Sequence, residues 1–392
     1  MTTKIPNTSS SQEKFHLRAK DNVPSNTTLL LAKVIFRNGK QPPIDNTTFF
    51  EFLKRRGKFE LEPYNVNDLA QEGKEDMYTF GIKLRRWYQK QIFGTNNQET
   101  NKNQVHIEST KHKACEESAK LVADGIFKHD FKKSIDGKHS SSSSMTTIND
   151  TLLSYFYSND NECRMPWSLQ QNIGNNFSSF RPYYGTRNKI AENLKVSRGG
   201  IQPQHMWKIN DYYKSMRFSG QELPEWLTED MLLDMDDSDR LFMKILFSGS
   251  YITQISGGVY ANMVLDKFQQ KSTERNNNEP RLELLCASEI IVAASISALT
   301  SAKTTASTKC GEDFAVVPKP GDALILELHK NHDGSKHYVK VLFWNFGSDA
   351  PQELKYKYCN EGCPLDQFQQ LLGGIIIKNR ELENCGVPLN NK

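Results

Sequence analysis

The sequence lacks an apolar run long enough to cross a membrane. Its longest apolar stretch, residues 290–299, is interrupted by Ser295 and Ser297 and is expected to form a buried element. No apolar segment follows Met1, so the sequence shows no signal peptide. Two explanations stay open: a cytosolic protein, or the mature form of a secreted protein with an added start methionine. We favour the second.

The sequence also has little excess charge. Its 50 Lys and Arg residues stand against 46 Asp and Glu residues, and the basic residues are scattered along the chain. A weak, dispersed excess argues against nucleic acid as a partner. His329, His332 and His337 lack the spacing of a metal site, and we expect them on the surface. Neither a metal nor an organic cofactor is predicted.

Cysteine is scarce and its count of seven is odd. Cys359 and Cys363 flank a short turn, which is close spacing for a local disulfide. Asn-x-Ser/Thr sequons favour a secreted glycoprotein only modestly, because an Asn-rich chain holds several by chance. These sequons begin at Asn7, Asn26, Asn46, Asn149 and Asn176.

What the sequence does contain is an alternation of predicted strands and helices. Residues 28–36 and 282–287 are apolar and predict buried strands, each followed at once by polar residues. Apolar residues recur at helical spacing over residues 68–91, and residues 105–107 predict a short strand. Residues 322–328 and 338–344 predict a hairpin, and the serine-rich residues 130–150 predict a surface loop.

This pattern predicts an α/β fold in three layers, a core sheet flanked by helices, with an inserted α-helical cap. The expected boundaries are a flexible arm over residues 1–27, a core over 28–127 and 236–392, and a mostly helical cap over 128–235. Ligands of open α/β sheets gather beyond the carboxyl ends of the strands. The residues that follow each predicted strand are therefore the candidates for a site.

Eight segments, in order, resemble the histidine acid phosphatases over roughly residues 29–388. Residues 34–39 are similar to the strand that leads into Arg-His-Gly-x-Arg in that family, and residues 105–110 to a strand that ends Ile-Arg-Ser-Thr. Residues 286–289 are similar to the family's Ser-Ala-His-Asp. The other similar segments are residues 69–73, 84–88, 223–226, 256–259 and 359–365. The resemblance implies a histidine-phosphatase-like core.

The resemblance also implies phosphomonoester hydrolysis, with a histidine nucleophile, arginines on the phosphate oxygens and an acid that protonates the leaving group. This chain departs from that pattern at most of the positions. The first arginine is kept as Arg37; the departures are Asn38 for the nucleophile, Gln41 and Glu108 for two arginines, Ser288 for the second histidine and Glu289 for the proton donor. Loss of the nucleophile alone costs several orders of magnitude in rate. We therefore expect a catalytically inactive pseudo-phosphatase.

The exchanges have a direction, because they remove positive charge and add a carboxylate. Glu108 and Glu289 would then face Arg37, and carboxylates in a partly desolvated site favour a cation. Trp207 resembles a tryptophan that lines the family's pocket, and an aromatic wall beside carboxylates suits an aromatic amine. The chain also resembles the salivary acid-phosphatase-like proteins of blood-feeding fleas. These bind biogenic amines such as serotonin, and in some members leukotrienes.

That resemblance implies a secreted protein that sequesters small host mediators in the former active-site pocket and so counters haemostasis and inflammation. Plainer interpretations stay open: Glu108 could pair with Arg37 in a collapsed pocket, Glu289 could cap the following helix, and Trp207 could belong to the core. Two other functional classes also stay open. One is a weak residual phosphomonoesterase that uses Glu289, and the other is a protein-interaction module on the same fold.

Two disulfides follow from the resemblance, Cys359–Cys363 and Cys163–Cys385. A third bridge of the family is lost at both ends, where this chain has Ser215 and Ala323. The cysteines without a family partner are Cys115, Cys286 and Cys310; of these, Cys286 lies in a predicted strand and is expected to be a buried thiol. Some members of the family are dimers, so a homodimer stays an open alternative.

Overall fold

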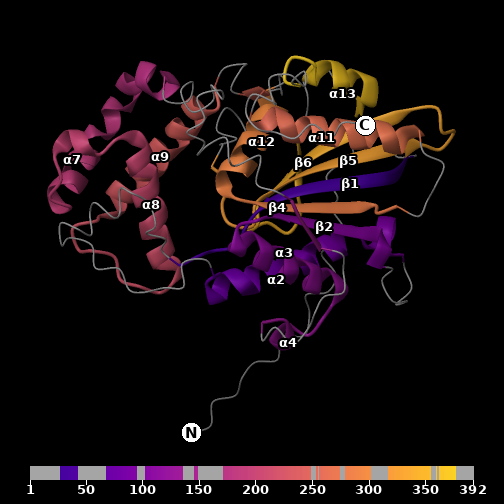
Figure 1. Ribbon diagram of the computed structural model, residues 1–392, viewed down its shortest axis with the longest axis horizontal. Helices are drawn as coiled ribbons and strands as arrows, with labels where there is room; N and C mark the ends of the chain where they lie inside the picture. The colour runs from indigo at the N-terminus through magenta and orange to yellow at the C-terminus, as the bar shows by residue number, and fades with distance from the viewer. Residues whose placement is uncertain are drawn as a thin grey trace, which may run out of the picture.

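The computed structural model describes residues 27–42, 68–94, 102–135, 145–148, 171–248, 253–254, 256–273, 279–301, 317–354, 359 and 362–376. Within them, one mixed sheet carries helices on both faces, and a separate group of helices stands beside it (Figure 1). The predicted three-layer α/β fold is confirmed. In this part of the chain, no helix is long and apolar enough to span a bilayer.

The sheet has the strand order β3-β2-β4-β1-β5-β6-β7, and β8 pairs with β6. Its strands are β1 (Thr27–Arg37), β2 (Val105–Thr110), β3 (Met145–Ile148), β4 (Leu282–Ala287), β5 (Ala323–Asn331), β6 (His337–Trp344), β7 (Gln352–Leu354) and β8 (Cys363–Pro364). β1, β4, β2 and β3 run parallel, whereas β5, β6 and β7 pair antiparallel. Because β1, β4 and β2 are parallel neighbours, their carboxyl ends meet at one edge.

Two layers of helices cover the sheet. One face packs against α2 (Gln71–Trp87) and α3 (Lys113–Phe127), and the other against α11 (Gly257–Thr273), α12 (Glu289–Ser301) and α13 (Leu365–Leu372). The shorter helical segments of the core are η1 (Gln89–Phe93), η2 (Lys102–Gln104) and α4 (Phe131–Ile135). The predicted helix over 68–91 and the strand over 282–287 are thus confirmed, the first with shorter bounds.

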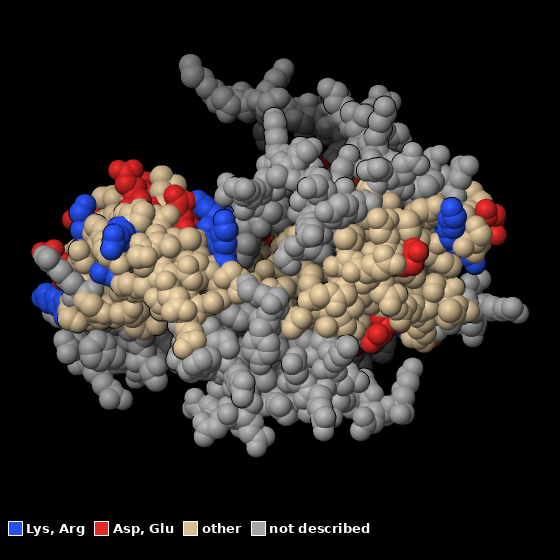
Figure 2. All heavy atoms as spheres, turned by 90° about the horizontal axis from the view of Figure 1, so that it is seen from above, with Lys and Arg blue, Asp and Glu red and all other residues tan. Residues whose placement is uncertain are grey.

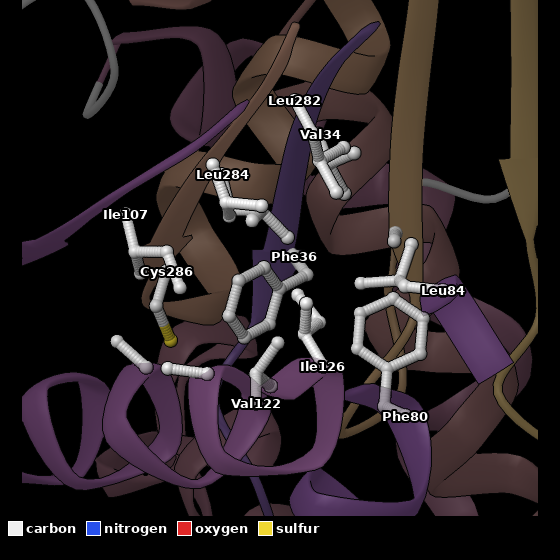
Figure 3. Close-up of a cluster of buried hydrophobic side chains, with 14 of the residues drawn as sticks. Val34, Phe36, Phe80, Leu84, Ile107, Val122, Ile126, Leu282, Leu284 and Cys286 are labelled. Atoms are coloured by element: carbon white, nitrogen blue, oxygen red, sulfur yellow. The ribbon is translucent and has the colours of Figure 1, made fainter. Parts of the chain in front are cut away.

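Alternation along β1 separates the two halves of the core, as the period of two in a strand requires. Val34 and Phe36 point toward α2 and α3 (Figure 3), while Ile35 packs into the cluster under α11 and α12. All three side chains are fully buried. Because this strand is buried on both faces, its sequence is a continuous apolar run and does not alternate between apolar and polar residues.

The helices beside the sheet form the cap. They are η3 (Phe177–Tyr183), α7 (Tyr184–Asn193), η4 (Arg198–Gly200), α8 (Pro203–Phe218) and α9 (Glu229–Leu246). Thr228 is the N-cap of α9, and its hydroxyl accepts a hydrogen bond from the Met231 amide at 3.3 Å. The expected core–cap boundary at 235–236 falls inside α9. Its last turns, with Phe242, share a cluster with Ile290 and Ala294 of α12.

Two details differ from the sequence-based expectations. Residues 145–148, expected in a surface loop, pair with β2 as β3. His329, expected on the surface, is 9% exposed and shares a 2.9 Å hydrogen bond with Glu327. Both errors arise from strand pairing with residues distant in the sequence, β3 with β2 and His329 of β5 with Leu29 of β1, which local composition does not reveal.

The cysteines divide into three groups. Cys359 and Cys363 form the predicted disulfide. Cys286 is fully buried and free, as expected, and Cys115 is a second buried free thiol. The predicted pair Cys163–Cys385 and the unassigned Cys310 lie outside the described residues, as does the expected N-terminal arm up to residue 26.

Candidate functional site

Arg37 is the last residue of β1 and stands at the edge where β1, β4 and β2 end. Its guanidinium donates to the Pro318 carbonyl at 2.8 Å, which fixes one side of the group. The other side pairs with Glu289 at 2.9 Å and with Asp211 at 3.3 Å. The retained arginine therefore joins the core to the cap.

Glu289 begins α12, with Ser288 between it and the end of β4, and only 8% of it is exposed. Besides Arg37, its carboxylate accepts a hydrogen bond from the Trp207 indole at 3.1 Å. Burial raises the pKa of Glu289; Arg37 opposes this and Asp211 adds to it. The carboxylate faces Arg37 and Trp207 and also lies in the first turn of α12, so contact with the cluster and a favourable place at the helix N-terminus coexist.

Helix α8 supplies a row of polar side chains beside Trp207. Asn210, Asp211 and Lys214 follow Trp207 at spacings of three, four and seven residues, so they share one face of the helix. The indole of Trp207 stacks on Phe242 of α9, with ring centroids 5.8 Å apart. Trp207 is thus a half-buried wall of the cluster, hydrogen-bonded through its one polar atom.

Helix α9 faces this row with two further carboxylates. Lys214 lies 2.6 Å from Asp236 and 3.8 Å from Asp239. The Asn210 amide donates to both, at 2.8 Å and 2.6 Å. Burial raises the pKa of Asp239 well above its ordinary value, although Lys214 and Asn210 oppose the shift. Within the described residues, Oδ1 of Asp239 and Oδ1 of Asn210 are buried without a partner.

These residues form what we call the polar cluster: Arg37, Glu289, Asn210, Asp211, Lys214, Asp236 and Asp239. It contains two cations and four carboxylates. Burial raises the pKa of Asp236, but Lys214, Asn210 and Arg240, which also pairs with Asp237, together lower it. The carboxylates therefore outnumber the cations. The buried oxygens Oδ1 of Asp239 and Oδ1 of Asn210 can each accept a hydrogen bond from a ligand. Figure 2 shows acidic and basic side chains gathered on the cap at the left.

Asn38 lies next to Arg37 but takes part in a different set of contacts. Its amide donates to Gln41 Oε1 and to the Gly39 carbonyl, both at 3.0 Å, and the residue is 5% exposed. Its backbone amide donates to Ala287 at the end of β4. Gln41, expected in the pocket, accepts this bond from Asn38, while Ser288 beside Glu289 is half-buried. A neutral, hydrogen-bonded carboxamide is not a nucleophile.

Close backbone packing fixes the loop that carries Asn38. A side chain on Gly39 would overlap the Gly73 carbonyl, and one on Gly73 would overlap the backbone of Lys40. The Ala70 amide also donates to the Lys40 carbonyl at 2.9 Å, just before α2. Only glycines permit this approach, which explains the two glycines that the sequence places after β1 and at the start of α2.

Glu108 stands outside the polar cluster. It lies two residues before the end of β2, and its carboxylate is 3.1 Å from the His106 ring on the same strand. The ion pairs of Arg37 go to Glu289 and Asp211, so the alternative of a pocket collapsed by a Glu108–Arg37 pair is wrong. The site that the sequence predicted at Arg37, Trp207 and Glu289 is brought together, without Glu108.

Sequence reasoning missed the five cluster residues that the cap contributes. The signal was present on α8, because three polar residues share the helical face of Trp207. A small hollow with a volume of about 10 Å³ lies elsewhere on the cap, and none of the expected site residues lines it. Its lining residues are Phe180, Tyr183, Tyr184, Arg187, Pro203, Met206 and Ser238.

Comparison with known proteins agrees with this architecture. The histidine phosphatase superfamily (branch 2) matches residues 51–344. Acid phosphatase-like protein XcAP-2 of Xenopsylla cheopis is 21% identical over 334 residues, 82% of this chain and 86% of that protein. Lysosomal acid phosphatase of Xenopus laevis is 21% identical over 367 residues, 91% of this chain and 78% of that protein.

Among solved structures, Hafnia alvei phytase in complex with tartrate has a TM-score of 0.67 at 11% identity, covering 93% of this chain and 100% of the phytase. At this identity the likeness shows the fold alone. The family match, in contrast, covers most of the chain, from ahead of α2 to the end of β6. This chain belongs to the histidine phosphatase superfamily, branch 2.

Proposed function

We propose that this protein is a non-catalytic, secreted member of its family that binds a small aromatic amine at the polar cluster and so sequesters it. The observation that carries the proposal is the excess of carboxylates, four against two cations, beside the stacked rings of Trp207 and Phe242. A ligand ammonium would supply the missing positive charge, and its ring would find an aromatic wall.

The residues at the former catalytic positions support the same proposal. Phosphate binding needs clustered guanidinium groups, and Arg37 is already shared between Glu289 and Asp211. Asn38, at the nucleophile position, uses its amide on Gln41 and Gly39. The resemblance to amine-binding salivary proteins of fleas, given above, also favours an amine as the ligand. In some members of that group the ligands are leukotrienes, so a lipid mediator belongs among the test ligands.

Calorimetric titration with serotonin, noradrenaline, histamine and a cysteinyl leukotriene tests the proposal. We expect micromolar or tighter binding of at least one amine. Asp211→Asn and Glu289→Gln should each weaken it by about tenfold or more, because a hydrogen bond to a charged group contributes about 1.5–3 kcal/mol. The absence of measurable heat with every ligand would end the proposal.

Asp237→Asn is the matched control. This residue lies on α9, next to Asp236 of the cluster, and pairs with Arg240, but its side chain is 48% exposed and stands outside the polar cluster. The same loss of one negative charge there should leave affinity within about twofold, since exposed pairs contribute little. An equal effect of Asp237→Asn and Asp211→Asn would mean that general charge, and not the cluster, attracts the ligand. Circular dichroism should confirm that each variant is folded.

One observation favours a second candidate, a weak phosphomonoesterase. A carboxyl group with a raised pKa, Glu289, lies beside the guanidinium of Arg37, and this is a pairing that could protonate a leaving group and hold a phosphate oxygen. Hydrolysis of p-nitrophenyl phosphate at acid pH distinguishes the two functions. We expect the protein and its Arg37→Ala variant to give the same background rate. A rate that is clearly higher in the unaltered protein would support the enzyme.

A further inference from the structure

The polar cluster is closed in this structure, so a ligand reaches its inner residues only after a movement of the protein. Asn210 is fully buried, Asp239 is 2% exposed and Glu289 is 8% exposed. Asp211, in contrast, lies at the seam between cap and core with 47% of its side chain exposed. The route to the buried carboxylates therefore begins where helix α8 lies against the edge of the sheet.

Helix α8 contacts the core through one stripe of side chains. Trp207, Asp211 and Phe218 follow one another at spacings of four and seven residues, which places them on the same face of the helix. Each contacts a different core residue at the carboxyl end of the sheet: Glu289, Arg37 and Lys40, respectively. The three contacts are a hydrogen bond to a carboxylate, an ion pair and a cation–π contact. None of the three buries one aliphatic side chain against another.

The contact at the end of α8 is fixed from the core side. The Lys40 ammonium lies 5.1 Å from the centre of the Phe218 ring, and it also pairs with Asp76 at 3.0 Å and with Glu72 of α2. Figure 1 shows this end of α8 near the start of α2. Two carboxylates thus hold the ammonium in place, and the Phe218 ring is the part of the contact that can move away. We call the contact between Lys40 and Phe218 the latch.

On its other side, the cap is joined to the core by apolar packing. Phe242, in the last turns of α9, shares a cluster with Ile290 and Ala294 of α12. Separation there would expose apolar surface to water, which is unfavourable in proportion to the area exposed. Hydrogen bonds and ion pairs at a surface, in contrast, are replaced by contacts with water at little net cost. The seam of α8 is therefore the side that opens, and the packing of α9 on α12 is the side that stays closed.

We propose that α8 is a gate over the polar cluster, hinged where α9 packs on α12 and held shut by the latch, an inference that rests on the amine binding of the proposed function. Opening separates Asp211 from Arg37 and exposes the carboxylate of Glu289, which an incoming ammonium then reaches. Neither partner of the latch belongs to the polar cluster, and the latch closes again over the bound ligand. Its strength therefore sets the rates of entry and exit together and leaves the affinity nearly unchanged.

Carboxyl footprinting tests the gate without any ligand. The full chain is treated with a carbodiimide and glycine ethyl ester, and the labelling rate of each carboxylate is measured by peptide mass spectrometry. We expect Glu289 to label about threefold faster in Phe218→Leu than in the unaltered protein, since loss of a partly exposed cation–π contact shifts an opening equilibrium by a factor of this order. Glu327, buried against Tyr88 at the far end of α2, should stay unlabelled in both proteins.

Met216→Leu is the matched control. Met216 lies on the same turn of α8 as Phe218 and is half-buried, but it packs against the core of the cap. This variant should leave the labelling rate of Glu289 unchanged. The proposal is overturned if Glu289 labels equally fast in Phe218→Leu and in the unaltered protein. A parallel rise at Glu327 overturns it as well, because the variant would then unfold generally and not open at α8.

Stopped-flow kinetics separates this proposal from the proposed function. Where serotonin binds, Phe218→Leu should raise its association and dissociation rate constants by the same factor, about threefold, and leave the dissociation constant within about twofold of the unaltered value. A change in one of the two rate constants alone contradicts the gate. If no amine binds, the proposed function fails, and the footprinting by itself still decides whether α8 opens over Glu289.

Discussion

Glu289 is a buried carboxylate whose partners in the protein, Arg37 and Trp207, leave it able to accept a further hydrogen bond from a ligand. Removal from water raises its pKa, while Arg37 and the Trp207 indole stabilise its charged form. Asp211 competes for the same guanidinium from the cap side and remains half exposed. Asp239, further into the cap, is held by Asn210 and Lys214 and also has a raised pKa because of burial. The cluster is thus close to the limit of negative charge that it can bury.

This balance predicts the pH dependence of amine binding. An amine binds the ionised carboxylates, and an alkylammonium keeps its charge to about pH 10. Affinity should therefore fall as pH falls through the raised pKa of Glu289, and the fall should begin above the ordinary pKa of 4.5 for such a group. Calorimetric titration with serotonin at pH values from about 4 to about 8, the range in which a buried carboxylate titrates, measures this change in the dissociation constant. Glu289→Gln should reduce this pH dependence, and the part that remains belongs to Asp239, whose pKa is also raised. A dissociation constant that stays level throughout would disprove the role of the carboxylates.

At the scale of elements, close helix packing sets the position of the loop after β1. Helices α2 and α3 approach each other at Gly81 and Gly125, where an added methyl group would overlap the carbonyl of Val122 or of Tyr78. Both helices contribute to the core that covers β1 and β4 (Figure 3). Their spacing therefore determines how the site edge of the sheet is supported.

Gly81→Ala should accordingly lower the free energy of unfolding by about 3 kcal/mol, since the methyl group would meet backbone and not a flexible side chain. Guanidinium unfolding followed by circular dichroism measures the change. Gly185→Ala in α7 is the control, because no atom lies within 4 Å of the added methyl group. There the substitution should raise stability by at most about 1 kcal/mol through helix propensity. Equal losses at both positions would contradict tight packing between α2 and α3.

At the scale of the whole molecule, the cap has a core of its own. A cluster between α7, α8 and α9 includes Ile190, Ile209 and Met235, all fully buried and separate from the clusters of the sheet. The cap joins the α12 side through Phe242 and through the ion pair of Arg37 with Asp211. Because the core of the cap contacts the core of the sheet only near α12 in the described residues, the two can unfold locally with different free energies.

Hydrogen exchange should therefore show two levels of protection. We expect amides of α7 and α8 to exchange through an opening of lower free energy than amides of β1 and β4, which lie in the middle of the sheet. Addition of a bound amine should raise the protection of α8 more than that of α2, because Trp207, Asp211 and Lys214 lie on α8. Uniform protection across cap and sheet, with or without ligand, would show that the molecule opens as one unit.

The order of strands and helices was accessible from sequence, because a strand buried on both faces leaves an apolar run and an amphipathic helix leaves its spacing. These signals located β1, α2, β4 and the hairpin of β5 and β6. They also placed Arg37, Asn38 and Glu289 at or next to strand ends, whereas the family came from the resemblance of short motifs and not from these signals. The short strand β3 escaped because its neighbour β2 is remote in sequence.

The composition of the site was decided by tertiary structure alone. Local sequence says that Glu108 and Glu289 are acids, but only the fold sends Glu289 to Arg37 and leaves Glu108 beside His106. Likewise, only packing brings Asp211 to Arg37 and Cys115 to Asn38. The reason is physical: local propensity acts over a few residues, whereas charge and thiol contacts depend on which distant elements the hydrophobic core brings together.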